Sequence, residues 1–95
     1  MYTIPMELEW DEAKRRETLE LRGLDFAWMA SFMWESAVIR SSDRAGEARW
    51  VATGYIGQRL FWAVYTERDG KMRIISLHKA NARERAQYMS ERSRL

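Results

Sequence analysis

The sequence of 95 residues contains no cysteine, one histidine and one proline. The absence of cysteine excludes disulfide bonds and thiolate chemistry, and it is typical of a protein from a reducing compartment. No apolar run approaches the roughly 18 residues that a membrane-spanning helix requires. The opening stretch MYTIPMELEW also lacks the basic and apolar regions of a signal peptide. We therefore expect a cytoplasmic protein that has no membrane partner.

Several kinds of catalytic site are missing as well. A single histidine without any cysteine leaves no convincing zinc site, and no glycine-rich loop of the GxxxxGK or GxGxxG type is present to cradle a phosphate. The carboxylates are scattered, without an obvious pair for glycoside hydrolysis. Ser76 lies close to His78, but no acidic partner for this histidine is evident, which argues against a serine nucleophile. We expect neither a metal ion nor a cofactor.

Aromatic residues, in contrast, are abundant. Five tryptophans and four tyrosines are present, and each buries a large area, which helps a short chain to build a core. A disordered chain would have few such residues. Because the length is also that of one domain, we expect residues 1–95 to form a single domain.

Basic residues are concentrated at the end of the sequence. Residues 71–95 contain seven Lys or Arg and two Glu, a net charge of +5, whereas residues 1–70 contain nine basic and twelve acidic residues, a net charge of −3. This asymmetry indicates contact with a polyanion, such as a nucleic acid, or with an acidic protein. A basic helix that merely faces water explains the charge equally well.

Capping residues predict two helices in the first third of the chain. Asp11 is a good N-cap for a helix over Glu12–Arg22, which Gly23 would end in a left-handed conformation. Asp25 would cap a second helix over Phe26–Glu35. Its apolar residues recur at the spacing of one helical face, namely Phe26, Met29, Ala30 and Met33.

The remainder of the chain predicts an antiparallel meander followed by a helix. A short first strand is expected over Glu7–Trp10, and alternating or β-branched segments predict the four strands Ala37–Arg40, Arg49–Ile56, Leu60–Thr66 and Met72–Leu77. Asp69-Gly70 is a strong signal for a type I′ hairpin turn. The predicted fold class is therefore α+β, with the order strand, two helices, four-stranded antiparallel meander and C-terminal helix.

The last helix has its own start signal. Asn81 is the expected N-cap, and Glu84, three residues later, completes a capping box. We expect the inward face of this helix to consist of Ala82, Ala86 and Met89.

The fourth meander strand and the start of the last helix carry a group of cations. If this strand is regular, Arg73, Ile75, Leu77 and Lys79 share one face. Lys79 and Arg83 flank a helix N-terminus, which can itself bind an anion, and such cations can hold a phosphodiester and stabilise the charge that grows as it is cleaved. Histidine titrates near neutral pH, so His78 is a candidate general acid or base. The alternative is a histidine packed or hydrogen-bonded near a strand end.

Short blocks of the sequence resemble, in order and spacing, those of the BrnT family over roughly residues 7–90. The blocks are Trp10–Lys14, Arg22–Phe26, Arg49–Gly54, Tyr65–Arg68, Arg73–Ser76, and Lys79-Ala80 with Arg83-Glu84 and Tyr88. The resemblance implies a toxin of a bacterial type II toxin–antitoxin pair, similar in fold to RelE-type ribonucleases. Such a toxin cuts RNA and arrests growth, and it is neutralised by a BrnA-like antitoxin, through which alone it would contact DNA.

The resemblance also implies site residues. Carried over position by position, it indicates an active-site set of Arg49, Glu67, Arg68, Arg73 and Lys79, to which we add His78. Lys71 and Arg83 are expected to bind RNA.

Two departures from the family pattern bear on activity. Thr18 and Arg22 stand where the family usually has Asn and His, and Ser76–Ala80 reads SLHKA where the family usually reads SARKA. His78 thus replaces an arginine, and histidine cannot copy the guanidinium fork that grips a phosphate, although it can titrate. Two hypotheses therefore stand: a metal-independent endoribonuclease, and a catalytically inactive module that only binds an antitoxin or nucleic acid.

Overall fold

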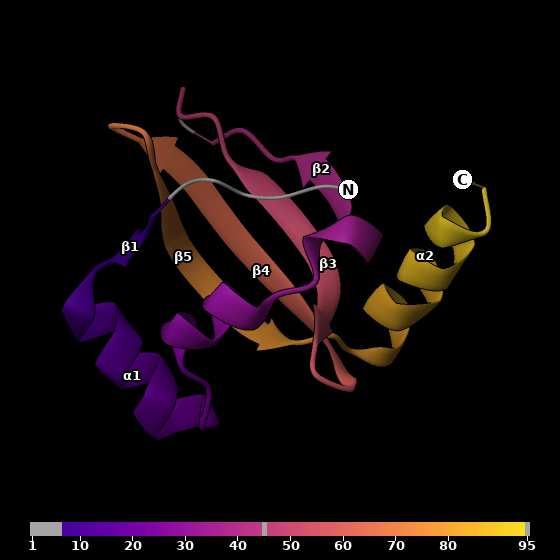
Figure 1. The fold of residues 1–95 in the computed structure, drawn as a ribbon, viewed down its shortest axis with the longest axis horizontal. Helices are drawn as coiled ribbons and strands as arrows, with labels where there is room; N and C mark the ends of the chain where they lie inside the picture. The colour runs from indigo at the N-terminus through magenta and orange to yellow at the C-terminus, as the bar shows by residue number, and fades with distance from the viewer. Residues whose placement is uncertain (1–6, 45, 95) are drawn as a thin grey trace.

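The computed structural model of the chain describes residues 7–44 and 46–94. The strands form one mixed sheet, and the helices pack against it (Figure 1). The predicted α+β class is confirmed. In chain order the elements are β1 (Leu8–Trp10), α1 (Glu12–Arg22), η1 (Phe26–Ser31), η2 (Trp34–Ser36), β2 (Val38–Ser41), β3 (Trp50–Ile56), β4 (Arg59–Arg68), β5 (Lys71–Lys79) and α2 (Ala82–Arg92). No helix within the described ranges is long and apolar enough to cross a membrane.

The sheet of the described residues has five strands in the order β1-β5-β4-β3-β2. Strands β2 to β5 pair antiparallel with their chain neighbours, whereas β1 pairs parallel with β5 at the far edge. The β4–β5 turn forms as expected, because Asp69 and Gly70 both adopt positive φ, at 54° and 75°. This hairpin is the longest pairing in the sheet, and it makes β5 an inner strand between β4 and β1.

The start and end of α1 agree with the prediction. The Asp11 carboxylate accepts a hydrogen bond from the N–H of Ala13 at 2.9 Å, and Gly23, with φ of 69°, donates its N–H to the carbonyl of Leu19. Two cations then join the helix to β5, beyond the short stretch that β1 covers. Lys14 Nζ donates to the carbonyl of Ile75 at 3.2 Å, and Arg22 donates to that of Leu77 at 2.9 Å.

The predicted helix over Phe26–Glu35 is wrong, because the chain forms two short 3₁₀ helices there, η1 and η2. After η1, Phe32 turns extended and bridges to Ile56, and the Met33 N–H donates to the carbonyl of Tyr55. Pairing with β3 therefore ends the helix. The buried residues Phe26, Met29 and Phe32 recur every three positions, as a 3₁₀ helix requires, and Met33 is exposed.

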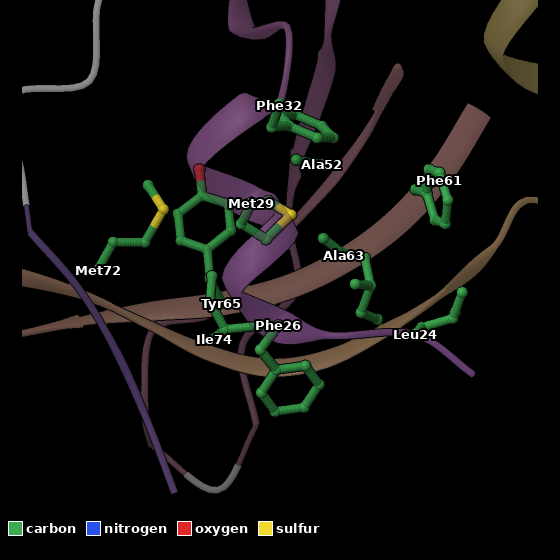
Figure 2. Close-up of a cluster of buried hydrophobic side chains, with 11 residues drawn as sticks. Leu24, Phe26, Met29, Phe32, Ala52, Phe61, Ala63, Tyr65, Met72 and Ile74 are labelled. Carbon is green, nitrogen blue, oxygen red and sulfur yellow. The ribbon is translucent and has the colours of Figure 1, made fainter. Parts of the chain in front are cut away.

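The main core lies between η1 and one face of the sheet. It contains Leu24, Phe26, Met29, Phe32, Ala52, Phe61, Ala63, Tyr65, Met72, Ile74 and Leu77 (Figure 2). A smaller cluster of Leu60, Ala80 and Tyr88 lies with α2. Because Leu60 and Phe61 are adjacent on a strand, their side chains leave opposite faces. The two clusters therefore stabilise opposite sides of the sheet.

The inward face predicted for the last helix is wrong. Ala82, Ala86 and Met89 are exposed, and among the described residues of α2 only Tyr88 is buried. The Tyr88 hydroxyl donates to the carbonyl of Ser36 at 2.8 Å, and its ring meets Tyr55 edge to face. The α2 side chains beside Tyr88 that face the sheet, Arg83, Glu84, Gln87 and Glu91, are polar, so α2 combines one apolar anchor with polar contacts.

Gly54 of β3 lies against the side chains of Phe32 and Ala37, with no room for a Cβ atom. An alanine Cβ at this position would lie 2.6 Å from Cζ of Phe32 and 3.2 Å from Cβ of Ala37. We expect Gly54→Ala to lower the free energy of unfolding by about 1–3 kcal/mol, since the buried Phe32 ring must move. Urea denaturation measures this loss.

The double variant Gly54→Ala with Phe32→Leu tests the cause. Because the smaller side chain makes room for the new methyl group, the double variant should lose less stability than the sum of the single losses. Additive losses would contradict the steric explanation.

Candidate active site

A bulge in β5 decides which side chains share the candidate site. Leu77 pairs with Ala63 and Ser76 with Val64, but Tyr65 then pairs with Ile74, so Ile75 is the extra residue. Beyond the bulge, the alternation of side chains between the two faces of the sheet is reversed. The expectation from a regular strand, that Arg73 lies on the face of Leu77 and Lys79, is therefore wrong.

Cross-strand pairs give the new arrangement. His78 lies opposite Trp62, Ser76 opposite Val64, and Arg73 opposite Thr66. Side chains of directly paired residues point the same way. Arg73, Ser76 and His78 consequently share the face that carries α2, while Met72, Ile74 and Leu77 remain in the main core.

His78 is held by two contacts on this face. Its ring stacks on that of Trp62, with centroids 4.6 Å apart and planes 13° apart. Its Nε2 lies 3.1 and 3.2 Å from the two carboxylate oxygens of Glu84. An ionised carboxylate only accepts hydrogen bonds, so in the neutral tautomer that suits this contact the proton is on Nε2 and Nδ1 is the acceptor. The imidazole is thus held in place by one ring and one carboxylate.

Glu84 also belongs to the capping box of α2, which forms as predicted. Its Oε1 accepts the N–H of Asn81 at 2.9 Å, while the Asn81 side chain accepts the N–H of Glu84 at 2.7 Å. One carboxylate therefore caps the helix and orients the histidine. The expectation that His78 lacks an acidic partner is wrong. The signal was present in the capping box, which begins three residues after His78.

A groove of about 330 Å³ adjoins this pair, between α2 and the sheet. We call it the α2 groove; it is lined by Val38, Arg40, Ser41, Ser42, Val51, Thr53, Trp62, Arg83, Glu84, Gln87, Tyr88 and Glu91. Arg40 is bound there by Glu91 at 3.2 Å, and by Gln87 when the amide oxygen faces the guanidinium. Within the described ranges, no acidic side chain pairs with Arg83. The α2 groove thus places an unpaired cation near a histidine–carboxylate pair.

A second group of charges lies at the β4–β5 hairpin end of the sheet. Glu47 bridges Arg49 and Arg68, at 2.8 and 3.2 Å. The hydrogen bond from Arg49, together with the charges of both arginines, holds the pKa of the Glu47 carboxyl below its ordinary value. Glu67 is exposed on the same hairpin. Lys71 pairs with Glu7, with 3.8 Å between Nζ and Oε2.

Two predicted residues lie elsewhere. Arg73 pairs with Glu9 of β1 at 3.2 Å, between the hairpin and the His78 end. The side chain of Lys79, next to His78 in the sequence, projects from the opposite face of the sheet and lines a separate cavity. We call this cavity the Trp28 hollow; its other lining residues are Arg22, Gly23, Leu24, Trp28, Ile56, Arg59 and Phe61.

The predicted site residues consequently divide into groups. Trp50 pairs with Tyr65, and Tyr65 with Ile74, so Arg49 lies at the level of Arg73 on β5. At about 3.3 Å per residue, this level is about 15 Å along the strand from His78, and β4 lies between the two residues, so Arg49 and His78 cannot contact one phosphate. The structure brings together Arg49 with Arg68, and His78 with the neighbourhood of Arg83. Sequence reasoning missed the partners that organise both groups, which are Glu47, Trp62 and Glu84. Among the described residues, no group of three or more His, Asp or Glu side chains could hold a metal ion.

A sheet face that presents a fixed imidazole–carboxylate pair and several arginines has the groups needed to bind and cleave a phosphodiester chain. A family model described as the ribonuclease toxin BrnT of type II toxin–antitoxin systems matches residues 10–84. The chain therefore belongs to the BrnT family of ribonuclease toxins, and membership of a type II family implies an antitoxin partner. No curated protein and no solved structure matches the chain.

The Glu47 bridge predicts a titration. Because Arg49 is the main cause of the lowered pKa, Arg49→Ala should raise the pKa of Glu47 towards its ordinary value, as followed by NMR of the side-chain carboxyl. A lowered folded-state pKa stabilises the fold above the unfolded pKa, and this contribution is lost as the pH falls through the folded value. The stability difference between wild type and Arg49→Ala should therefore shrink below about pH 4.

The matched control is Arg85→Ala, since Arg85 is exposed on α2 and lies away from this bridge. It should leave the Glu47 titration unchanged. An unshifted pKa of Glu47 in Arg49→Ala would contradict the assignment.

Proposed function

We propose that this chain is an endoribonuclease toxin that cleaves RNA without a metal ion and arrests growth in the cytoplasm. Residues 1–95 act as one toxin domain of RelE-like layout. A BrnA-like antitoxin neutralises it and provides its only contact with DNA. Membership of the BrnT family supports the reaction class. The observation that carries the proposal is the His78–Glu84 pair, stacked on Trp62 at the edge of the α2 groove.

The proposed reaction is an internal transfer within RNA. The 2′ oxygen attacks the adjacent phosphorus, a 2′-O–P bond forms, and the bond from phosphorus to the 5′ oxygen breaks. His78 Nδ1 accepts the proton of the 2′-hydroxyl, and the Glu84 carboxylate stabilises the imidazolium that results. The leaving 5′ oxygen takes up a proton from water. The products are a 2′,3′-cyclic phosphate and a 5′-hydroxyl end.

Cations of the same face bind the RNA backbone in this proposal. Arg83, at the α2 groove, stabilises the charge that develops on the scissile phosphate. Arg73 lies about 15 Å further along β5 and holds a neighbouring phosphate. The Arg49–Arg68 pair and Lys71 extend the basic track to the hairpin. Glu67 and Lys79 then lie away from the scissile phosphate.

The first test removes the proton-transfer group. Replacing His78 by Gln keeps a planar polar side chain beside Trp62 but cannot accept and hold a proton. We expect the rate of cleavage of a fluorophore-labelled RNA, in buffer with EDTA, to fall at least about 10²-fold. Growth arrest on expression should also be lost, while the circular dichroism spectrum stays that of the wild type.

A second variant, His78→Arg, separates proton transfer from phosphate binding. Arginine supplies a guanidinium but no titrating group near neutral pH, so the proposal expects His78→Arg to be slow as well. A faster His78→Arg would mean that this position binds phosphate only. A wild-type chain that neither cleaves RNA nor arrests growth would identify the inactive binding module.

Arg83 and Arg85 form a matched pair for the second test. Both are exposed arginines in the first turn of α2, and only Arg83 lines the α2 groove. Arg83→Gln should lower kcat/KM by about tenfold or more, because a charge-assisted contact to the phosphate is lost. Arg85→Gln changes the net charge equally and should leave kcat/KM near the wild-type value. Equal losses in the two variants would contradict a specific role for Arg83.

A further inference from the structure

The Trp28 hollow has an apolar floor and a basic rim. Its volume is about 330 Å³. Leu24 and Phe61 at its floor are each only 4% exposed, whereas Trp28 is 40% exposed and meets Phe61 edge to face, with centroids 6.3 Å apart. The partly exposed Trp28 side chain thus lies next to an apolar surface formed by the nearly buried Leu24 and Phe61. This arrangement is typical of a binding site rather than of scattered surface residues.

The charges around the Trp28 hollow all have one sign. Arg22, Arg59 and Lys79 line it, and none of its lining residues in the described part of the chain is acidic. Arg22 donates a hydrogen bond from one guanidinium nitrogen to the carbonyl of Leu77, whereas Arg59 and Lys79 form no ion pair with any described side chain. Three cations around an apolar floor complement a ligand that is anionic and partly apolar.

The Trp28 hollow is separate from the α2 groove. Phe61 lines the hollow and Trp62 the groove, and adjacent residues of a strand point to opposite faces. Lys79 and His78 divide in the same way. A ligand in the Trp28 hollow therefore does not occupy the place proposed for the scissile phosphate.

We propose that the Trp28 hollow docks an acidic segment of the antitoxin. One apolar side chain of this segment packs against Trp28 and the floor of the hollow, and its carboxylates pair with Arg59 and Lys79. Naming the antitoxin as the source rests on the proposed function. A protein segment fits better than RNA, because Leu24 and Phe61 at the floor are each only 4% exposed, whereas bases need an open ring face on which to stack.

The test is an NMR titration of the isotope-labelled full chain with a synthetic peptide in which single leucines separate pairs of glutamates. We expect shifts at the Trp28 indole N–H and at the Phe61 and Lys79 amides. Arg59→Glu should weaken the dissociation constant by about fivefold or more, whereas Arg85→Glu, an equal charge change on α2, should leave it within about twofold.

Companion probes define what would overturn the proposal. Replacing the leucines by glutamines, or the glutamates by lysines, should abolish the shifts. If the glutamine peptide binds as tightly as the leucine peptide, an apolar side chain does not anchor the segment. If Arg59→Glu binds the leucine peptide as tightly as the wild type, the basic residues around the hollow do not contribute to binding. Displacement of the peptide by a single-stranded uridine oligonucleotide would assign the Trp28 hollow to RNA instead.

The titration is independent of RNA cleavage. His78→Gln should bind the glutamate–leucine peptide like the wild type, even though it loses the proposed ribonuclease activity. Loss of peptide binding with cleavage intact would refute docking alone, and intact peptide binding in a chain that cuts no RNA would refute the enzyme alone.

Discussion

The extra residue in β5 is the constraint on which the arrangement of this protein depends. Without Ile75 out of register, a regular strand would carry Arg73 to the face of Leu77, inside the main core. Burying that guanidinium against Phe26 and Met29, while Ile74 turned to the opposite face, would be costly. The bulge lets β5 contribute Met72, Ile74 and Leu77 to the core, yet present Arg73 and His78 on the opposite side.

The same strand is supported differently along its two edges. On one edge it pairs with β4 over nearly its whole length, and on the other β1 covers only Met72–Ile74. Beyond that stretch the carbonyls of Ile75 and Leu77 accept from Lys14 and Arg22 of α1. Basic side chains of α1 thus complete the hydrogen bonding of β5 at the bulge. Arg22 therefore has a structural role here.

Local chemistry could be predicted from the sequence, and contacts across the fold could not. The caps at Asp11 and Gly23, the Asn81–Glu84 box and the positive φ values of Asp69-Gly70 depend on a few adjacent residues. The 3₁₀ form of Phe26–Ser31 depends on the bridge between Phe32 and Ile56. The contact between His78 and Glu84 depends on how α2 packs back against the sheet. The candidate site was therefore foreseen as a set of residue types, while its division into two groups at opposite ends of β5 required the sheet register.

The shallow apolar attachment of α2 makes this helix a separate unit of local unfolding. Tyr88 anchors it by its ring and by its hydroxyl bond to Ser36, and further contacts are an ion pair from Glu91 to Arg40 and the Glu84 bond to His78. Opening of α2 exposes the small cluster of Leu60, Ala80 and Tyr88 but leaves the main core intact, so it costs less than global unfolding. An open α2 carries Arg83 and Glu84 away from the sheet and leaves His78 without its carboxylate. The fraction of molecules with α2 closed consequently sets the fraction in which the imidazole is oriented, although most of the core lies on the other side of the sheet.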